Sequence, residues 1–363
     1  MIKTSIISTI PLFLSATGNI IYLDWFAQDL QNDKLFDLVD GGKEWQLLRE
    51  RLRKQGYDIT TYRYNNKKND IFYGTQFDIP TNHAKLSDLY GTNRCALFLW
   101  EPPSVKPANF DKNLHKDINL IFTWADDLVD NKKYFKFFYP QPNSTPLEKI
   151  PYEKKKFCCT LIANKRSNHP QELYSERLKT VIFFEKNAPD LLDLYGPGWE
   201  RQNFSCYKGF VPDKLQTLAH YKFSLCYENI RDIAGYVSEK IHHCLLAGCV
   251  PIYWGASNIT DYIPAECFID RRKFSSNKEL FKFLISMSRT EYEAYLEAAQ
   301  QYLISPKQML FSNLYFVDCL LKGFIPDYKQ ENFFSEKERD LLKNIHIEQE
   351  KIIQKEKIKK SFA

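Results

Sequence analysis

Apolar runs typical of buried strands alternate with amphipathic helical segments along most of this chain, most clearly in its second part. The strand-like runs there are 157–163, 191–195, 223–227 and 249–253, and the helical segments are 170–187, 213–219, 238–246 and 278–286. A helix between two parallel strands forms a right-handed crossover that covers one face of the sheet. The expected fold class is therefore α/β, with a mainly parallel sheet covered on both faces.

The first part of the chain shows a similar alternation. Its strand-like runs are 20–23, 57–62, 95–100 and 118–122, and its helical segment is 44–55. The stretch 140–156 contains four prolines and few large apolar residues, which is typical of a linker. We therefore expect two Rossmann-like domains, 1–150 and 151–330, that face a cleft, followed by a charged helical tail over 331–363. Ligands of such sheets bind beyond the carboxyl ends of the strands.

The positive charge of the chain is concentrated at its end. The formal net charge is +5, and the last thirteen residues hold five Lys and one Glu. The nearly neutral body argues against a protein that grips phosphate backbones, so we expect no nucleic-acid partner. The segment 335–360 is predicted to be a helix. It is either a solvated helix that packs weakly on the body, which we favour, or a basic anchor for peripheral contact with an anionic membrane.

Cysteine usage and the N-terminus bear on the compartment. Nine cysteines without a C-x-x-C pair favour a reduced, cytoplasmic chain. The apolar stretch 5–14 and the small residues after it resemble a weak signal peptide, but we favour a loose leader into a first strand. The stretch is too short for a membrane-spanning helix. We expect a soluble or peripheral protein, and cleavage of residues 1–17 stays open.

Several motifs are absent from the sequence, and their absence argues against several function classes. No G-x-G-x-x-G follows a strand, no G-x-x-x-x-G-K-[S/T] occurs and no H-E-x-x-H is present, which disfavours dinucleotide dehydrogenases, P-loop ATPases and a zinc site. There is also no D-x-D triplet, with which many transferases of nucleotide-linked groups hold a divalent metal. We therefore expect no metal and no cofactor, so that protein cations and helix N-termini neutralise any diphosphate leaving group.

The segment 223–268 holds the most informative polar residues. A buried strand ends at Glu228 and Asn229, which places polar groups at its carboxyl end. A helix is predicted to start near Glu239 and Lys240. The helix dipole favours a carboxylate in the first turn and disfavours a Lys there unless an anion lies nearby. Lys240 is therefore either an exposed Lys of a capped helix or a contact for a phosphate.

The run 223–255 resembles the C-terminal signature of glycosyltransferase family 10, the α-1,3-fucosyltransferases. That signature is roughly F-x-L-x-F-E-N-S, D-Y-V-T-E-K-L and A-G-x-V-P-I-x-x-G, and the chain has FSLCYEN, GYVSEKI and AGCVPIYWG at matching spacings. The departures are Tyr227 for Phe, Ile230 for a small hydroxyl residue and Ser238 for Thr. Weaker similarity extends over about 94–268, whereas the first eighty residues and the tail lie outside the resemblance.

The resemblance implies a two-domain GT-B fold and an inverting, metal-independent transfer of fucose from GDP-fucose to a glycan acceptor. It also implies roles for residues of the donor pocket. The Glu-Lys pair of the family contacts the ribose hydroxyls and the diphosphate, which corresponds to Glu239 and Lys240 here. Tyr236 and Asn229 correspond to residues that line the same pocket.

The family also has an Arg early in the helix after the first strand of the C-terminal domain, where it makes a second phosphate contact. Arg166 in the loop after 157–163 and Arg177 in the following helix are the candidates. We favour Arg177 because it fits the order of the motif, and the choice stays open. A guanidinium suits a diphosphate because it offers bidentate, permanently charged donors.

An inverting transfer needs a general base for the acceptor hydroxyl, and Glu101 is the leading candidate. It follows the apolar strand 95–100 directly, and it resembles the Glu that the family uses as its proposed base. Burial beside Trp100 is expected to raise its pKa towards working pH and make it a better base. Asp126 and Asp127 are rival candidates, and Trp124 either stacks on a sugar ring or fills the core.

The leading functional hypothesis is therefore an α-1,3- or α-1,4-fucosyltransferase that acts on an N-acetylglucosamine-containing glycan. The alternatives are the same fold with another GDP-linked sugar donor, and a catalytically silent protein that binds a glycan or a nucleotide. The retention of Glu101, Glu239 and Lys240 argues against the silent protein. The acceptor, its reacting hydroxyl and the oligomeric state are not predicted by the sequence.

Overall fold

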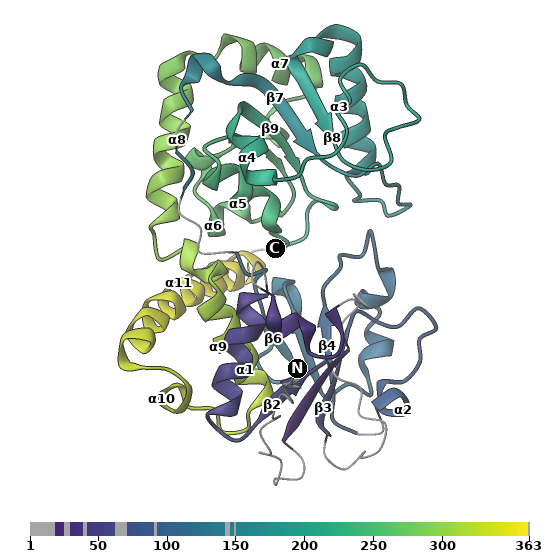
Figure 1. Cartoon of the computed structure of the whole chain (residues 1–363), viewed down its shortest axis with the longest axis vertical. Helices are drawn as coiled ribbons and strands as arrows, with labels where there is room; N and C mark the ends of the chain where they lie inside the picture. Colours follow the sequence, from purple (N-terminus) through teal and green to yellow (C-terminus); the bar gives the residue numbers. More distant parts are fainter. Residues whose placement is uncertain are drawn as a thin grey trace, which may run out of the picture.

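The computed structural model of the chain describes residues 19–24, 30–38, 42–61, 71–90, 93–141, 146–148 and 150–361. It contains two parallel β-sheets, stacked along the long axis of the molecule, with helices around each (Figure 1). We use N-terminal lobe for the first sheet and the helices packed on it, and C-terminal lobe for the second sheet and its helices. The signal-peptide-like stretch 5–14 lies outside the described residues.

The sheet of the N-terminal lobe has six strands in the order β2-β1-β3-β4-β5-β6, and every pairing is parallel. The strands are β1 Ile20–Asp24, β2 Asp58–Thr60, β3 Ile71–Phe77, β4 Cys95–Leu99, β5 Leu120–Thr123 and β6 Tyr134–Lys136. All five residues of β4 are buried, as expected for a central strand covered on both faces. This strand ends two residues before Glu101.

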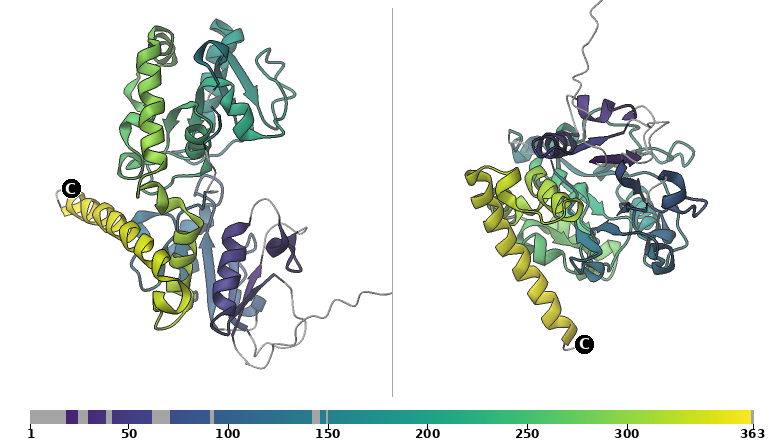
Figure 2. Two further views of the ribbon diagram at one scale, coloured as in Figure 1. Left: turned by 60° about the vertical axis from the view of Figure 1, so that its left-hand side comes forward. Right: turned by 90° about the horizontal axis from the view of Figure 1, so that it is seen from below.

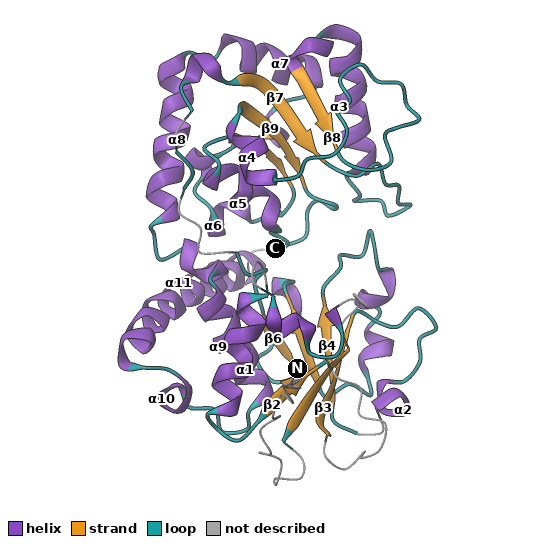
Figure 3. Cartoon of the chain, viewed as in Figure 1, coloured by secondary structure: helices purple, strands orange, loops and turns teal. Residues whose placement is uncertain are grey.

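The sheet of the C-terminal lobe has five strands in the order β11-β10-β9-β7-β8, again all parallel. The strands are β7 Lys156–Leu161, β8 Leu192–Tyr195, β9 Tyr221–Tyr227, β10 Val250–Trp254 and β11 Ile269–Asp270. The predicted strands of this lobe lie within one or two residues of β7 to β10. The arrows of β7, β8 and β9 point towards the other lobe, so their carboxyl ends face the lobe junction (Figure 3).

Eleven α-helices occur in the described residues. They are α1 Lys43–Arg53, α2 Leu86–Tyr90, α3 Tyr174–Asn187, α4 Lys214–Ala219, α5 Glu239–Leu246, α6 Ile259–Tyr262, α7 Asn277–Ser286, α8 Arg289–Leu303, α9 Asn313–Phe324, α10 Gln330–Phe333 and α11 Glu336–Ser361. The sequence predicts α1, α3, α4, α5, α7 and α11 with small shifts at their ends. No helix of the described residues combines the length and the apolar character needed to cross a bilayer.

Helix α9 returns the chain from the C-terminal lobe to the N-terminal lobe. It packs on α1, β5 and β6. Phe316 meets Trp45 edge to face with ring centroids 5.4 Å apart, and Phe324 lies 4.9 Å from Phe122. Gly323 allows this approach, because a Cβ there would lie 2.7 Å from the Phe122 ring. The range 151–330 that the sequence assigns to the second domain thus includes a helix of the N-terminal lobe, and the domain limits stay a prediction.

Helix α11 touches both lobes and lies at the edge of the molecule (Figure 2). Near its start, Glu338 forms an ion pair with Arg51 of α1 at 2.6 Å. In its middle, His346 contacts the buried carboxylate of Asp318 in α9 at 2.9 Å. Near its end, Lys355 pairs with the buried Asp261 of α6 in the C-terminal lobe. The charges of α11 therefore hold it to the body in at least three places.

A second polar cluster ties the lobes together at Asp126, in the short 3-10 helix Asp126–Leu128. One carboxylate oxygen accepts a hydrogen bond from Lys136 at 2.6 Å. The other oxygen accepts bonds from Asn258 at 2.9 Å and Tyr262 at 2.6 Å, both from the C-terminal lobe. The backbone N–H of Gly235 donates to Asn258 at 2.9 Å. Gly235 has φ of 86°, and a side chain there would collide with the backbone of the N-terminal lobe.

All nine cysteines are free and buried in the structure. They lie in the cores of the two lobes, where a free Cys behaves as a small apolar side chain.

Candidate active site

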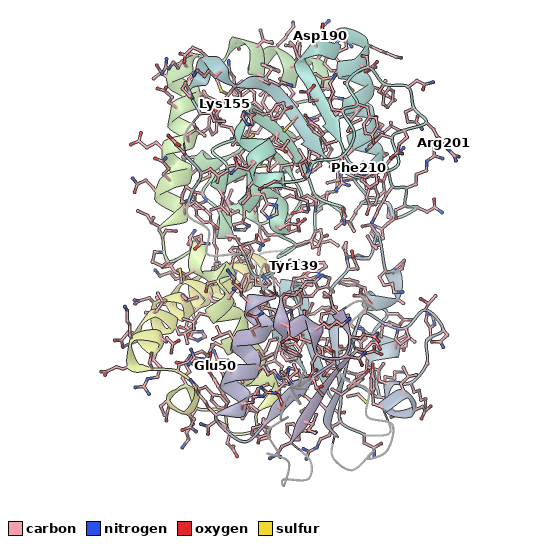
Figure 4. The ribbon with its side chains drawn as sticks, viewed as in Figure 1. Glu50, Tyr139, Lys155, Asp190, Arg201 and Phe210 are labelled. Carbon is pink, nitrogen blue, oxygen red and sulfur yellow. The ribbon has the colours of Figure 1, made fainter. Side chains whose placement is uncertain are left out.

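The candidate residues meet where the carboxyl end of β4 faces the carboxyl ends of β7 and β9. Tyr139 lies between the two lobes and marks this place (Figure 4). Its ring is 5.0 Å from that of Trp100 in the N-terminal lobe and 6.3 Å from that of Tyr236 in the C-terminal lobe. The structure thus brings the predicted base and the predicted donor residues to one junction.

The loop that carries Glu101 is held by the carboxylate of Asp78. One oxygen of Asp78 accepts the backbone N–H groups of Trp100 at 2.8 Å and Glu101 at 2.9 Å. Asn109 donates to the same oxygen at 2.5 Å and to the Glu101 carbonyl at 3.0 Å. Asp78 itself has a left-handed backbone with φ of 58°. These bonds fix the position from which the Glu101 side chain projects.

The side chain of Glu101 is partly buried and lies within electrostatic reach of the C-terminal lobe. Burial raises the pKa of its carboxyl, and the neighbouring carboxylate of Asp78 raises it further. Lys165 and Lys240 of the other lobe lower it in part, and Glu239 adds a smaller upward effect. Because three of these charges belong to the C-terminal lobe, Glu101 lies where a base would act on a substrate held by that lobe. Its raised pKa agrees with the expectation from its apolar strand.

Glu228 is a functional candidate that sequence reasoning did not select. It follows β9 directly and is fully buried. Its carboxylate accepts bonds from the Ser238 N–H at 2.8 Å, the Ser238 hydroxyl at 2.7 Å and the Lys240 ammonium at 3.1 Å. A buried carboxylate requires such partners. The sequence signal that could have pointed to Glu228 is its position at the end of an apolar strand, twelve residues before Lys240.

Lys240 has an anion beside it within the protein itself. It is the second residue of α5, and its ammonium binds Glu228 and, at 2.9 Å, the Ser238 hydroxyl. Although burial lowers the pKa of this Lys, the carboxylates of Glu228 and Glu239 outweigh that effect and raise it. The placement of a cation at a helix start therefore does not by itself require a phosphate, because Glu228 supplies an anion within the protein. An ammonium has three donors, and two of them have these partners.

Glu239 is the first residue of α5 and is partly exposed. The charge of Lys240 lowers the pKa of the Glu239 carboxyl to about 2. Burial opposes this effect, and a hydrogen bond from the backbone N–H of Glu239 adds to it. The carboxylate is therefore charged at any pH at which the protein functions. It presents hydrogen-bond acceptors at the start of a helix, as contacts to ribose hydroxyls require.

Arg177 is buried under the end of β9. Its guanidinium donates to the Tyr227 carbonyl at 2.7 Å and to the Asn229 side chain at 2.9 Å. The Nε of Arg177 is buried and has no hydrogen-bond partner among the described residues. Arg166, the rival, lies exposed in the loop after β7. The structure thus groups Arg177 with Asn229, which keeps Arg177 as the better candidate.

The aromatic candidates pack at the same junction. The Tyr236 ring is buried and lies 4.6 Å from the ring of Trp124. Trp124 is also buried, and its indole N–H donates to the Trp100 carbonyl at 3.1 Å. Trp124 therefore fills the core between the lobes and is not free to stack on a sugar.

The rival base Asp126 is engaged in the lobe contact described above, and Asp127 is exposed on the outer side of that turn. Both oxygens of Asp126 are thus occupied by partners within the protein. Two cavities, of about 470 and 340 Å³, lie elsewhere: the first is lined by the linker and α8, and the second by Asp126, Asp127 and α11. Neither includes Glu101, Arg177 or Lys240.

Comparisons with known proteins agree with this arrangement. The model of the family described as glycosyltransferase family 10 (fucosyltransferase) C-term matches residues 151–323. A mouse α-(1,3)-fucosyltransferase 7 is 28% identical over 54% of this chain and 47% of its own length. An Arabidopsis thaliana α-(1,4)-fucosyltransferase is 45% identical over 18% of this chain and 16% of its own. The chain thus spans less than half of these curated relatives.

Solved structures share the fold at low sequence identity. A crystal structure of an α1,3-fucosyltransferase aligns with a TM-score of 0.53 and 15% identity, over 86% of this chain and 92% of its own. A glycosyltransferase from Rickettsia africae aligns with a TM-score of 0.52 and 10% identity, over 85% and 98%. The two facing parallel sheets are the GT-B arrangement of an α/β fold. Residues 151–323 are thus similar to the C-terminal part of glycosyltransferase family 10, the fucosyltransferase family.

Proposed function

We propose that this protein transfers L-fucose from GDP-fucose to O-3 or O-4 of an N-acetylglucosamine-containing glycan, with inversion and without a metal. The observation that carries the proposal is the position of Glu101, a carboxyl of raised pKa within electrostatic reach of Lys240 and Glu239 of the other lobe. The match of residues 151–323 to the fucosyltransferase family model supports the donor class. Curated relatives are named α-(1,3)- and α-(1,4)-fucosyltransferases, which supports the reaction type.

In the proposed reaction, residues of the C-terminal lobe bind the donor, and Glu101 of the N-terminal lobe acts on the acceptor. Lys240 and Arg177 bind the diphosphate and neutralise the charge that develops on it as the bond from the sugar to phosphate breaks. Glu239 and Asn229 orient the nucleoside part. Glu101 removes the proton from the acceptor hydroxyl, whose oxygen forms the new bond at the opposite face of the sugar carbon.

The test of the proposal is incubation with GDP-fucose and a panel of lactosamine acceptors, with GDP release and product linkage as readouts. Transfer from GDP-fucose supports the proposal. Transfer only from another GDP-linked sugar favours the second donor hypothesis, and binding of GDP without transfer to any acceptor favours a silent binding protein.

Transfer activity is expected to be unchanged by EDTA. In the proposed mechanism, Lys240 and Arg177 neutralise the diphosphate in place of a metal, and their position at the same junction supports this role. The measurement is the initial rate of GDP release after dialysis against EDTA, with and without added Mg²⁺ or Mn²⁺. Loss of activity that either metal restores would contradict the metal-free mechanism. A metal-dependent transferase assayed in parallel serves as the control for chelation.

Peripheral membrane contact through the tail remains a second proposal. Its support is the run of basic residues near the end of α11, although Lys351 pairs with Glu348 and Lys355 with Asp261. We expect co-sedimentation with phosphatidylserine vesicles that falls as salt is raised, because screening weakens surface electrostatics. Equal recovery with neutral phosphatidylcholine vesicles would contradict an electrostatic anchor.

A further inference from the structure

Tyr174 is a buried tyrosine at the lobe junction whose hydroxyl lacks a partner. It is the first residue of α3, one turn before Arg177, and its side chain is 5% exposed. Its hydroxyl has no hydrogen-bond partner among the described residues. A buried hydroxyl without a partner destabilises the folded state, so native proteins rarely keep one without a use.

The surroundings of this hydroxyl are those of an anion site. The guanidinium of Arg177 lies 4.9 Å from the centre of the Tyr174 ring. Burial raises the pKa of Tyr174, and the charges that act on it are Arg177, then Glu101 of the other lobe, then Lys240. Tyr174 thus packs against one predicted phosphate cation and lies within electrostatic reach of the other and of the predicted base.

Ser104 lies beside the Tyr174 hydroxyl from the other lobe, in the loop that follows Glu101. The Ser104 hydroxyl is also buried and also lacks a hydrogen-bond partner in the described part of the chain. The Tyr174 and Ser104 hydroxyls are close enough to act on each other, and this contact lowers the pKa of Tyr174. Neither hydroxyl, however, has a hydrogen-bond partner of normal geometry among the described residues, and the Nε of Arg177 has none either. Donors left in this state suit a ligand that accepts several hydrogen bonds. A phosphate group, with its three acceptor oxygens, has that character.

We propose that the Tyr174 hydroxyl donates a hydrogen bond to the diphosphate of the bound nucleotide, as a further donor-binding residue of the site. The proposal rests on the proposed function, since it assumes a nucleoside diphosphate between Arg177 and Lys240. The hydroxyl stays protonated and gives up no atom. Its role is to hold the leaving group as charge develops on it.

The test compares Tyr174→Phe with Tyr292→Phe by titration calorimetry with GDP and with GDP-fucose. Tyr292 is the matched control, because it is 2% exposed, also lacks a hydroxyl partner and lies in α8 away from the junction. We expect Tyr174→Phe to lower the affinity for both GDP and GDP-fucose roughly ten- to a hundredfold, which is the effect of losing one hydrogen bond to a charged group. Tyr292→Phe should leave both affinities unchanged.

Thermal melting separates a binding role from a structural one. Removing an unpaired hydroxyl should leave the melting temperature of Tyr174→Phe at or above that of the wild type. Lower stability of both Tyr174→Phe and Ser104→Ala, with normal GDP affinity, would show that the two hydroxyls serve each other and would overturn the proposal. If Tyr174→Phe binds GDP-fucose more weakly but GDP with normal affinity, the hydroxyl contacts the sugar. That result would also overturn the proposal.

The wild-type titration distinguishes failure of this proposal from failure of the proposed function. If wild-type protein binds GDP and Tyr174→Phe binds it equally well, only the role of Tyr174 is wrong. If the wild type binds neither GDP nor GDP-fucose, the proposed donor is wrong and the Tyr174 proposal falls with it.

Discussion

Glu101→Gln is expected to lower the rate of fucose transfer by roughly 10²–10⁴-fold while GDP affinity stays nearly unchanged. Gln keeps the size of the side chain but cannot accept the acceptor proton. The donor residues lie in the other lobe, and Glu101 is held by backbone bonds to Asp78 that the substitution leaves intact. Initial rates with saturating acceptor, beside calorimetry with GDP, measure the two quantities separately.

The pH dependence of the rate provides an independent check. Only the ionised form of Glu101 can take a proton, so the wild-type rate should fall as pH drops through its pKa, which burial raises. The Gln variant should lack this fall at low pH. A raised pKa in the folded state also means that ionisation of Glu101 opposes folding above its unfolded pKa, so Glu101→Gln should not lower the melting temperature at neutral pH.

Glu44→Gln is the matched control for this experiment. Glu44 lies in the first turn of α1 in the same lobe, and burial also raises the pKa of its carboxyl. Its replacement should leave both the rate and its pH profile unchanged. Near-normal turnover of Glu101→Gln would remove Glu101 as the base and return attention to Asp126 and Asp127.

Lys240→Ala is expected to weaken GDP-fucose binding roughly ten- to a hundredfold through loss of a charge-assisted contact. It should also destabilise the fold, because it leaves the fully buried Glu228 without its cation. Breaking a buried ion pair lowers the free energy of unfolding by about 3 kcal/mol or more. We expect the lower end of this range, because the Lys240 side chain is 23% exposed. Calorimetry with GDP-fucose and chemical denaturation measure the two effects.

The double variant Lys240→Ala with Glu228→Gln separates the two effects. Neutralising Glu228 removes the unpaired charge, so much of the lost stability should return, while donor affinity should stay low. If affinity returns together with stability, Lys240 supports the fold and does not contact the donor. If Lys240→Ala alone binds GDP-fucose normally, Lys240 lies outside the site.

The sequence predicts strands and helices well where one segment alone determines them. The apolar runs that became β4 and β9 are buried on both faces, so their character does not depend on distant partners. Strand β3 was missed because Gly74, Thr75 and Gln76 interrupt its apolar pattern. The placement of α9 could not be predicted from the sequence. An amphipathic segment shows that one face of a helix packs on the protein, but not which of the two sheets it packs on.

The candidate site was predicted to a similar extent. Motif spacing pointed to Glu239 and Lys240, and an apolar strand pointed to Glu101, because these signals are local. The pairing of Lys240 with Glu228 joins the start of a helix to the end of a strand, and only the folded chain shows that distance. Tyr174 carried no sequence signal, because an unpaired hydroxyl is defined by its surroundings and not by its neighbours in the chain.

The return of α9 to the N-terminal lobe has a consequence for biosynthesis. All five strands of the second sheet have been translated by Asp270. Trp45 and Phe122 of the first lobe can make their ring contacts only after Phe316 and Phe324 of α9 have been translated. Domains usually fold in the order in which the ribosome delivers them. Here the lobe that is translated first is completed last, and its apolar face stays open to chaperones until more than three hundred residues have been made.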